Sequence, residues 1–188
     1  PTPTAKALDV TIMHQNDTHA RLDAVAKTVT TVKEVRAAKK NTLLLHAGDV
    51  FSGTLYFNEF YGQADVAFMN LMGVDAFVLG NHEFDLGSSA TGHKGLADFL
   101  KVAKFPTVAA NVDASKDEHI APLQSRTVSA SPTDGRIYDA VIQTIGSEKV
   151  GIFGLTTAET ANISSPGSIA FENYIEAAKA TVTKLQAQ

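Results

Sequence analysis

Three short polar clusters carry residue types that suit metal-ion chemistry. They are Asn16-Asp17-Thr18-His19, Gly48-Asp49 and Gly80-Asn81-His82-Glu83. Carboxylate, imidazole and amide groups are ligands for Zn²⁺, Mn²⁺ or Fe, and the chain has no cysteine to select softer metals. The clusters therefore indicate a site for divalent ions that is built from oxygen and nitrogen ligands.

Each candidate ligand has an expected task. Asp17 and His19 lie two positions apart and can bind one ion together. Asp49 can bridge two ions through its two oxygens, and Asn81 offers a neutral oxygen to the second ion. Two ions about 3.5–4 Å apart form a clamp for in-line attack on phosphorus. Taken singly, each cluster is typical of a turn or a helix cap, so the prediction depends on all three occurring together.

A predicted strand precedes each cluster. The strands are expected at Val10–His14, Leu43–Leu45 and Ala76–Leu79. In open α/β sheets, ligands bind beyond the carboxyl ends of the strands. If these strands are parallel, all three clusters lie at one edge of the sheet.

The spacing of the clusters fits repeated strand–helix–strand units. Asp49 follows Asp17 by 32 positions, and Asn81 follows Asp49 by the same number. The intervening segments Leu22–Lys40 and Gln63–Met72 have apolar residues at helical spacing, and the second is apolar on nearly all sides. This alternation favours an α/β fold with a mainly parallel sheet.

The pattern continues and then changes. A helix over Leu96–Ala103 and a strand over Thr107–Ala110 extend the alternation. Later strands at Leu123–Val128, Ile137–Ile145 and Val150–Leu155 are separated by turn residues, so we expect antiparallel hairpins there.

The last predicted element is an amphipathic helix. Its apolar face is expected to consist of Ile175, Ala178, Val182 and Leu185. In a fold of this kind another strand ordinarily follows a helix, so we expect the sequence to be truncated.

Composition limits the classes of function. With 188 residues, 44% of them hydrophobic, the chain is one globular domain or a piece of a larger protein. A net charge of −4 without a basic cluster argues against binding of nucleic acid polymers. No apolar run is long enough to span a membrane. Residues 1–7 are expected to be a linker or a mature N-terminus left after removal of a signal peptide.

The motifs resemble those of the calcineurin-like metallophosphoesterases, and in finer detail the 5′-nucleotidase family. The resemblance covers the chain from about Leu8 to its end. The segments that carry it are His14–Ala20, Gly48-Asp49, Gly80–Asp85, Phe105–Val112 and Val150–Thr157.

The resemblance implies a fold and a domain organisation. The fold would be a metallophosphoesterase-type α/β/β/α sandwich, truncated before its last strands. Residues 8–188 would form the N-terminal part of the catalytic domain. In this family two later blocks, one with a single histidine and one with Gly-His-x-His, complete the site, and a C-terminal domain stacks the nucleobase. The C-terminal remainder of the same protein is therefore expected to complete the site.

The resemblance also implies an activity and a role for each site residue. The reaction would be dimetal-dependent hydrolysis of nucleotide phosphate monoesters, with two divalent ions (Zn, Mn or similar) and a metal-bound hydroxide as nucleophile. His82 would contact the phosphate and stabilise the transition state, oriented by Asp85. The implied metal ligands are Asp17, His19, Asp49 and Asn81.

Other activities are open on the same fold. They are a cyclic-nucleotide phosphodiesterase, a nucleotide-sugar hydrolase, a sulfur-ester hydrolase, or a surface protein that binds without catalysis. For the enzyme we expect a place in nucleotide catabolism and an extracellular, cell-surface or periplasmic location.

Several further residues have ordinary structural explanations. His14 and His46 are expected to pack behind the ligands, and His93 and His119 to be exposed to solvent. Glu83 is interpreted as a structural hydrogen-bond acceptor.

Aromatic and amide side chains near the predicted site are also assigned. Asn111 follows a predicted strand. It is a turn former or, as the resemblance implies, a residue that supports the site or contacts the substrate. Packing of the loop and helix after Asp49 is expected to involve Phe51, Tyr56, Phe57 and Phe60.

Overall fold

Strands and helices alternate along the first part of the chain. The computed structural model describes residues 7–188. Residues 1–6 of the segment predicted to be a linker, 1–7, lie outside the described residues. In chain order the elements are β1 (Thr11–Gln15), α1 (Val25–Ala38), β2 (Thr42–His46), α2 (Leu55–Phe60), α3 (Gln63–Met72), β3 (Ala76–Val78), the 3₁₀ turn η1 (His82–Phe84), α4 (Lys94–Val102), β4 (Thr107–Val108), β5 (Val112–Asp113), η2 (Ala121–Leu123), β6 (Gln124–Ser129), β7 (Ile137–Ile145), β8 (Glu148–Phe153), α5 (Thr160–Ile163), β9 (Ala170–Phe171) and α6 (Tyr174–Gln186).

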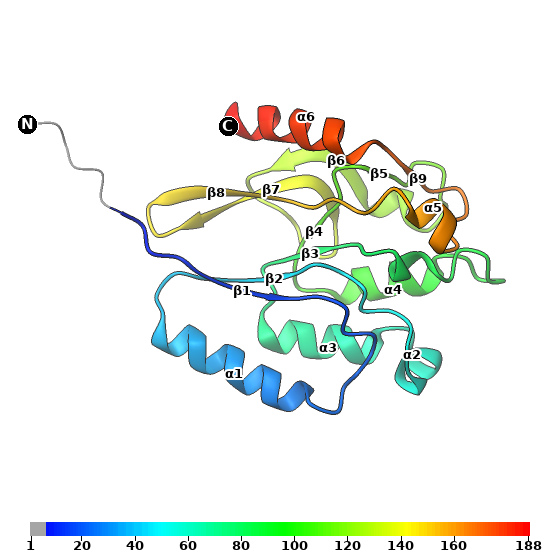
Figure 1. Cartoon of the computed structure of the whole chain (residues 1–188), viewed down its shortest axis with the longest axis horizontal. Helices are drawn as coiled ribbons and strands as arrows, with labels where there is room; N and C mark the ends of the chain where they lie inside the picture. Colours follow the sequence, from blue (N-terminus) through cyan, green and yellow to red (C-terminus); the bar gives the residue numbers. More distant parts are fainter. Residues whose placement is uncertain (1–6) are drawn as a thin grey trace, which may run out of the picture.

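The main sheet has the strand order β1-β2-β3-β4-β7-β6, and β8 also pairs with β7. Every neighbouring pair along this order is parallel, whereas β8 is antiparallel to β7. Helices α1, α3 and α4 lie on one side of the sheet and α6 on the other (Figure 1). The predicted α/β class with a mainly parallel sheet is thus confirmed.

Helix α3 has the predicted bounds, and glycines mark both of its ends. Gly62 and Gly73 have φ angles of 81° and 68°, a left-handed conformation that glycine adopts without strain. Only one face of the helix is buried, because Met69 is 3% exposed and Leu71 is 59% exposed. The expectation of a helix buried on nearly all sides is therefore wrong.

An aromatic core supports the middle of the sheet. The ring of Phe77 in β3 lies 5.6 Å from that of Phe99 and 6.1 Å from that of Phe105. All three are fully buried. Burying such a side chain contributes about 1.5–3 kcal/mol, so β3 is a rigid base for the loop that follows it.

The second part of the sheet confirms one predicted hairpin and not the other. β7 and β8 are antiparallel and joined by a tight turn, in which Gly146 has a φ of 62°. β6 and β7 were expected to be antiparallel but are parallel. Residues 130–136 between them can span about 23 Å, enough to carry the chain back along the sheet. The backbone N–H of Gly135 donates to Phe105 O and ties this crossing to the start of β4.

Helix α6 buries a face that overlaps the predicted one only in part, since Ala178 and Leu185 are half-buried. Ala177 and Thr181 are the residues it buries. Ile175 and Val182, expected on the packed face, are 50% and 39% exposed.

Polar contacts set the rotation of α6. The Asn173 side chain caps its first turn by accepting from the backbone N–H of Ile175 and Glu176. Near the other end, Lys184 Nζ lies 2.8 Å from Asp139 Oδ2 in β7, and Asp139 also pairs with Arg126. Ala177 and Thr181 then face the sheet and Leu185 packs beside Gly151 of β8, whereas Ile175 and Val182 face outward.

Candidate metal centre

The first two polar clusters form adjoining loops at the carboxyl ends of β1 and β2. The backbone N–H of Asp17 donates to Gly48 O, and that of His19 donates to Asp49 O, both at 3.0 Å. Asp17, His19 and Asp49 have φ angles of 52°, 47° and 56°. Non-glycine residues seldom adopt this conformation, and such residues concentrate at functional sites.

Two glycines allow the second and third loops to touch. A Cβ on Gly48 would collide with the backbone of Gly80, and a Cβ on Gly80 would collide with the Asp49 carboxylate. Gly48 also has a φ of 92°, so a side chain there would be strained as well as crowded. Glycine at both positions brings the Asp49 loop directly beside the His82 loop.

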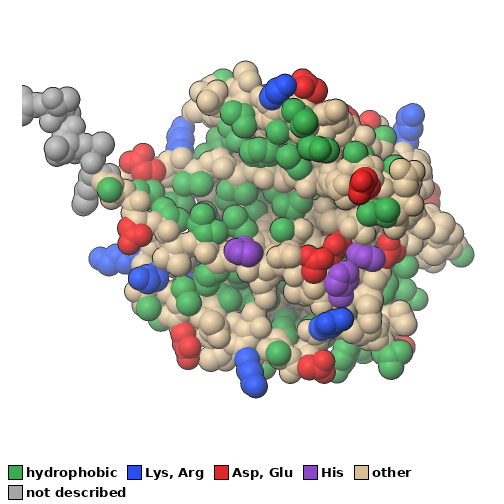
Figure 2. Space-filling view, viewed as in Figure 1, with side chains coloured by type: hydrophobic (Ala, Val, Ile, Leu, Met, Phe, Trp, Pro, Cys, Tyr) green, Lys and Arg blue, Asp and Glu red, His purple; other side chains and the backbone are tan. Residues whose placement is uncertain are grey.

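The three loops place His19, Asp49 and His82 together. Each offers a ligand atom within 4.8 Å of the other two. Asp17 adjoins them, with its Oδ1 3.8 Å from His19 Nε2. Histidine and acidic side chains gather at this end of the sheet (Figure 2). Imidazole nitrogen and carboxylate oxygen are ligands of Zn²⁺ or Mn²⁺, so the donor set fits a divalent ion.

The predicted site residues are thus neighbours in the structure. Asn81 immediately precedes η1 and is half-buried in the same loop as His82. The imidazole of His82, expected to face the substrate, also lies within reach of the ion-binding cluster. Ligand and substrate-facing roles for His82 make different predictions, which mutation can separate.

The side chains of His82 and Asp85 are in direct contact. Its Nδ1 lies 2.7 Å from Asp85 Oδ2. Partial burial lowers the pKa of His82, but the hydrogen bond to Asp85 and nearby negative charges outweigh burial, so the pKa is above its ordinary value. Burial raises the pKa of Asp85, but hydrogen bonds from Ser52 and His82 outweigh it and the pKa is lowered. The pair therefore favours a protonated Nδ1 that donates to an ionised carboxylate.

Glu83 is a structural hydrogen-bond acceptor, which confirms the interpretation of the sequence. Its carboxylate is fully buried. One oxygen accepts from the backbone N–H of Val50 and Phe51, and the other accepts from those of Asp49 and Gly80, at 2.6–3.2 Å. A single carboxylate thus joins the second and third loops.

The histidines outside the cluster differ in burial. His46 is buried, and its Nδ1 accepts from the backbone N–H of Gly48, so it supports the turn before Asp49. Burial lowers the pKa of His46 to about 4. His14, expected to pack, is exposed on β1, and His119 is partly exposed.

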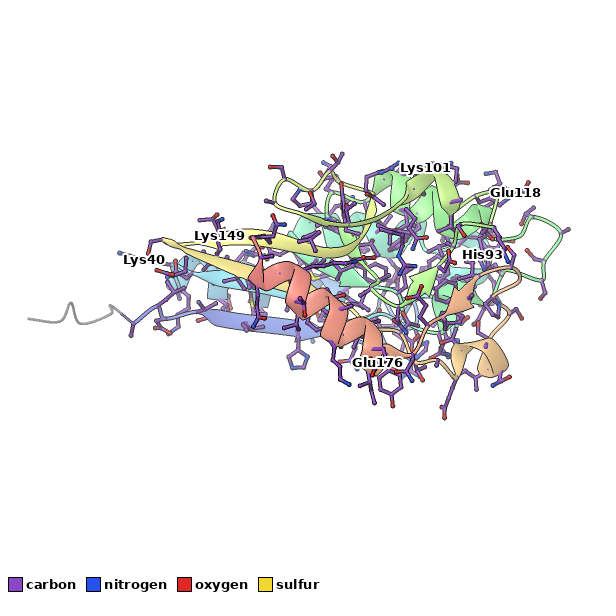
Figure 3. All side chains as sticks on the ribbon, turned by 90° about the horizontal axis from the view of Figure 1, so that it is seen from above. Lys40, His93, Lys101, Glu118, Lys149 and Glu176 are labelled. Carbon is purple, nitrogen blue, oxygen red and sulfur yellow. The ribbon has the colours of Figure 1, made fainter. Side chains whose placement is uncertain are left out.

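The expectation that His93 is exposed is wrong. The residue is 1% exposed, with Nδ1 2.7 Å from Asp117 Oδ2. Its ring packs edge-on against Phe84 in η1. In Figure 3 His93 lies inside the outline of the molecule, whereas Glu118 and Lys101 reach its rim. Asp117 is 24 positions away, so the local polar sequence did not reveal the contact that permits burial.

Asn111 supports the edge of the site from within. It is fully buried and bonds both ways with the backbone of Thr156, through Nδ2 to Thr156 O and Oδ1 to Thr156 N. The Thr156 hydroxyl in turn donates to Leu79 O, at the end of β3. Of the roles left open for Asn111, the contacts favour support of the site.

The aromatic residues after Asp49 divide into two groups. Phe51 and Phe57 are buried and their rings lie 4.9 Å apart, as the packing interpretation requires. Tyr56 and Phe60 are each 47% exposed, so packing of these two is not confirmed.

Sequence reasoning missed three residues that touch the site. Ser52 and Ser164 donate to the Asp85 carboxylate, and Thr156 anchors the loop before His82. Because the partners are 33, 79 and 77 positions apart, no local pattern could have revealed them.

A crevice beside Asp17 contains an acidic side chain that should make stability depend on pH. The crevice has a volume of about 240 Å³ and is lined by residues of β1, α1, β2 and α3, among them Asp65. Asp65 is 4% exposed, and among residues 7–188 its Oδ2 has no hydrogen-bond partner. Burial raises the pKa of Asp65 from 3.8 to about 6. Its favourable contribution to folding is therefore fully present below about pH 4 and lost as pH rises through about 6.

We predict that Asp65→Asn abolishes this loss. The free energy of unfolding of the variant, relative to the original chain, should rise by up to about 3 kcal/mol between pH 4 and pH 8. Urea unfolding at both pH values in the presence of a chelator measures it. The control is the exposed Asp23→Asn. Equal pH dependence in all three proteins would contradict the prediction.

The fold and the site together define a class of protein. Its members have a mainly parallel α/β fold, and here the strand ends present a cluster of side chains able to hold a metal ion. A family model described as calcineurin-like phosphoesterase matches residues 10–138, and the chain belongs to this family.

Individual relatives extend the match. The chain is 40% identical over 95% of its length to the trifunctional nucleotide phosphoesterase protein YfkN of Bacillus subtilis, covering 13% of that protein. It is 38% identical over 95% of its length to the snake venom 5′-nucleotidase of Naja atra, covering 34%. The crystal structure of a 5′-nucleotidase precursor from Thermus thermophilus is 41% identical, with a TM-score of 0.82 over 95% of this chain and 34% of that one. The chain thus spans about a third or less of these relatives.

Proposed function

We propose that residues 8–188 form the N-terminal part of the catalytic domain of a metal-dependent 5′-nucleotidase. The reaction is hydrolysis of the phosphate monoester of a nucleotide. The observation that carries the proposal is the meeting of His19, Asp49 and His82 within 4.8 Å at the carboxyl edge of the sheet. The names of the relatives support a nucleotide as substrate.

Four residues would hold two divalent ions, Zn, Mn or similar. Asp17 and His19 bind the first, Asp49 is shared, and Asn81 belongs to the second. When bound, the ions supply Lewis acidity and hydroxide at neutral pH. Asp17, His19 and Asp49 share a left-handed backbone, and His19 and Asp49 offer ligand atoms within 4.8 Å of each other.

His82 is proposed to act on the phosphate. With Nδ1 donating to Asp85, Nε2 is the ring nitrogen left to face the substrate. When Nε2 carries a proton, that atom can donate to a phosphoryl oxygen as negative charge develops. Asp85 keeps the ring in the orientation that this donation needs.

A C-terminal remainder is proposed to complete the site. The matched relatives are about three times as long as this chain or longer. On the side of the sheet that carries α6, apolar side chains gather at the surface (Figure 2). Ile12, Tyr174, Ile175 and Val182 are among the exposed apolar residues. We propose that the remainder packs on this apolar face and supplies further metal ligands.

Export from the cytoplasm is part of the proposal. The Naja atra relative is named as a snake venom protein, and venom is a secretion. Within residues 7–188, no helix is both long and apolar enough to cross a bilayer. Detection of the protein outside the cell or in the periplasm of its source would test the proposed location.

The test of the function uses the protein with its C-terminal remainder. We expect release of phosphate from AMP with Mn²⁺ or Zn²⁺, and weaker hydrolysis of a cyclic nucleotide or a nucleotide sugar. Asp49→Asn should lose bound metal and activity together. Replacing a residue that only supports a metal ligand typically lowers metal affinity or activity about 10–100-fold, and loss of a ligand should lower them further.

The matched control is Asp98→Asn, on the surface of α4, which should keep both properties. Preference for a cyclic nucleotide or a nucleotide sugar would replace the proposed substrate. Full activity of Asp49→Asn would overturn the proposed site.

A further inference from the structure

The carboxylate of Asp85 is held from two sides by serine hydroxyls. Ser164 Oγ donates to Oδ1 at 2.8 Å, and Ser52 Oγ donates to Oδ2. The same Oδ2 is 2.7 Å from His82 Nδ1. Both carboxylate oxygens therefore have hydrogen-bond partners. The two serines fix the orientation of the carboxylate relative to the His82 ring.

Ser52 sits in a strained part of the loop that carries Asp49. Its φ is 68°, a conformation that costs a non-glycine residue about 1–3 kcal/mol. The adjoining Gly53 packs so closely on His19 that a Cβ there would collide with it. The strained backbone places the Ser52 hydroxyl between the loop of the metal ligands and Asp85.

Ser164 directly follows the last residue of α5, and it bonds to the other oxygen of the Asp85 carboxylate. The segment that leads to it is anchored at Thr156, which is 3% exposed and donates through its hydroxyl to Leu79 O at 2.6 Å. Asn111 fixes the backbone of Thr156 on its other side. The segment 156–164 is thus attached to the His82 loop both before it, at Leu79, and after it, at Asp85.

We propose that Ser164 and Ser52 are positioning residues that act on His82 through Asp85. The segment 156–164, which follows β8 and contains α5, then helps to fix the orientation of His82. This inference rests on the proposed role of His82 in phosphate-ester hydrolysis, and it adds the groups that give the histidine its orientation.

A purely structural role for the serines makes a different prediction. Loss of a structural hydrogen bond would lower stability and leave turnover of the folded protein unchanged. Loss of a positioning contact lowers kcat at constant KM and metal content. Because a hydrogen bond to a charged group is among the stronger ones, we expect about a tenfold fall in kcat for Ser164→Ala.

The first experiment measures kcat, KM and bound metal for the protein with its C-terminal remainder. Ser164→Ala should lower kcat alone, Ser164→Thr should restore it, and the neighbouring Ser165→Ala should have no effect. In an Asp85→Asn background, Ser164→Ala should add little, because its target is already altered. Additive effects in this double-mutant cycle, or an equal loss in Ser165→Ala, would overturn the proposal.

Ser52→Gly separates positioning from stability. Glycine adopts a φ of 68° without strain, so the variant should melt no lower than the original protein. Because it lacks the hydroxyl, its kcat should nevertheless fall about as much as that of Ser164→Ala. Unchanged kcat in Ser52→Gly would remove Ser52 from the proposal.

A spectroscopic measurement tests the positioning even if the proposed function fails. In protein labelled with ¹⁵N-histidine, the His82 ring signals are those that disappear in His82→Gln. Ser164→Ala should shift them, and Ser165→Ala should not. If AMP is not hydrolysed but the shift occurs, the proposed function fails and the positioning contact stands. If AMP is hydrolysed but neither the signals nor kcat respond, the positioning proposal fails.

Discussion

Replacing His82 by alanine is expected to lower kcat on a nucleoside monophosphate by about 10²–10⁴-fold, the usual contribution of a positioned proton donor. Bound metal and most of the stability should be retained, because the proposed ligands Asp17, His19, Asp49 and Asn81 are left in place. Kinetics, elemental analysis and the melting temperature, measured on the same preparation with its C-terminal remainder, are the readouts.

Asp85→Asn is the companion variant and should show a smaller loss. The carboxylate raises the pKa of His82, so its removal should also move the high-pH limb of the kcat profile toward lower pH. A His82→Ala protein that sheds its metals would instead identify His82 as a ligand. The ring of His82 is placed to act as a ligand, because its nitrogen lies within 4.8 Å of ligand atoms of His19 and Asp49.

The second large effect concerns the buried carboxylate of Glu83. In Glu83→Gln, an NH₂ group would replace an oxygen that accepts from two backbone N–H groups, so donors would face donors. The cost of leaving buried donors unpaired should reach about 3 kcal/mol or more. That corresponds to a fall in melting temperature of roughly 6–12 °C for a domain of this size.

Metal affinity should fall with stability in Glu83→Gln, because the carboxylate joins the backbone of the Asp49 loop to that of Gly80. The matched control is Glu118→Gln at an exposed carboxylate, which should change stability by less than about 0.5 kcal/mol. Melting curves with and without added metal would measure both effects. If the two variants melt alike, the four hydrogen bonds are not what holds these loops together.

Local patterns in the sequence predict the part of the fold that positions the metal ligands. β1, β2 and β3 are short runs of apolar or β-prone residues, and the segments between them have helical periodicity. Since parallel strands end at one edge, the residues that follow each strand had to become neighbours. The contacts of Glu83 with both loops agree with its interpretation as a structural acceptor.

Longer-range features were not predictable in the same way. β6 and β7 are parallel because the seven residues between them carry the chain back along the sheet. These residues include the turn formers that also occur in hairpins, so the sequence predicted an antiparallel pair. His93 is buried because Asp117 comes from a distant segment to pair with it. Ser52 and Ser164 reach Asp85 only after β2, β3 and β8 have been assembled.

The sequence by itself therefore determined which residues could bind metal and that they meet at one edge of a parallel sheet. Those outcomes follow from the chemistry of the side chains and from the spacing of apolar residues in strands and helices. Only the tertiary structure decided which face α6 buries, which histidines are enclosed, and which hydroxyls hold Asp85. Each of these depends on a partner tens of residues away, and the chain brings such partners together only when the whole sheet is packed.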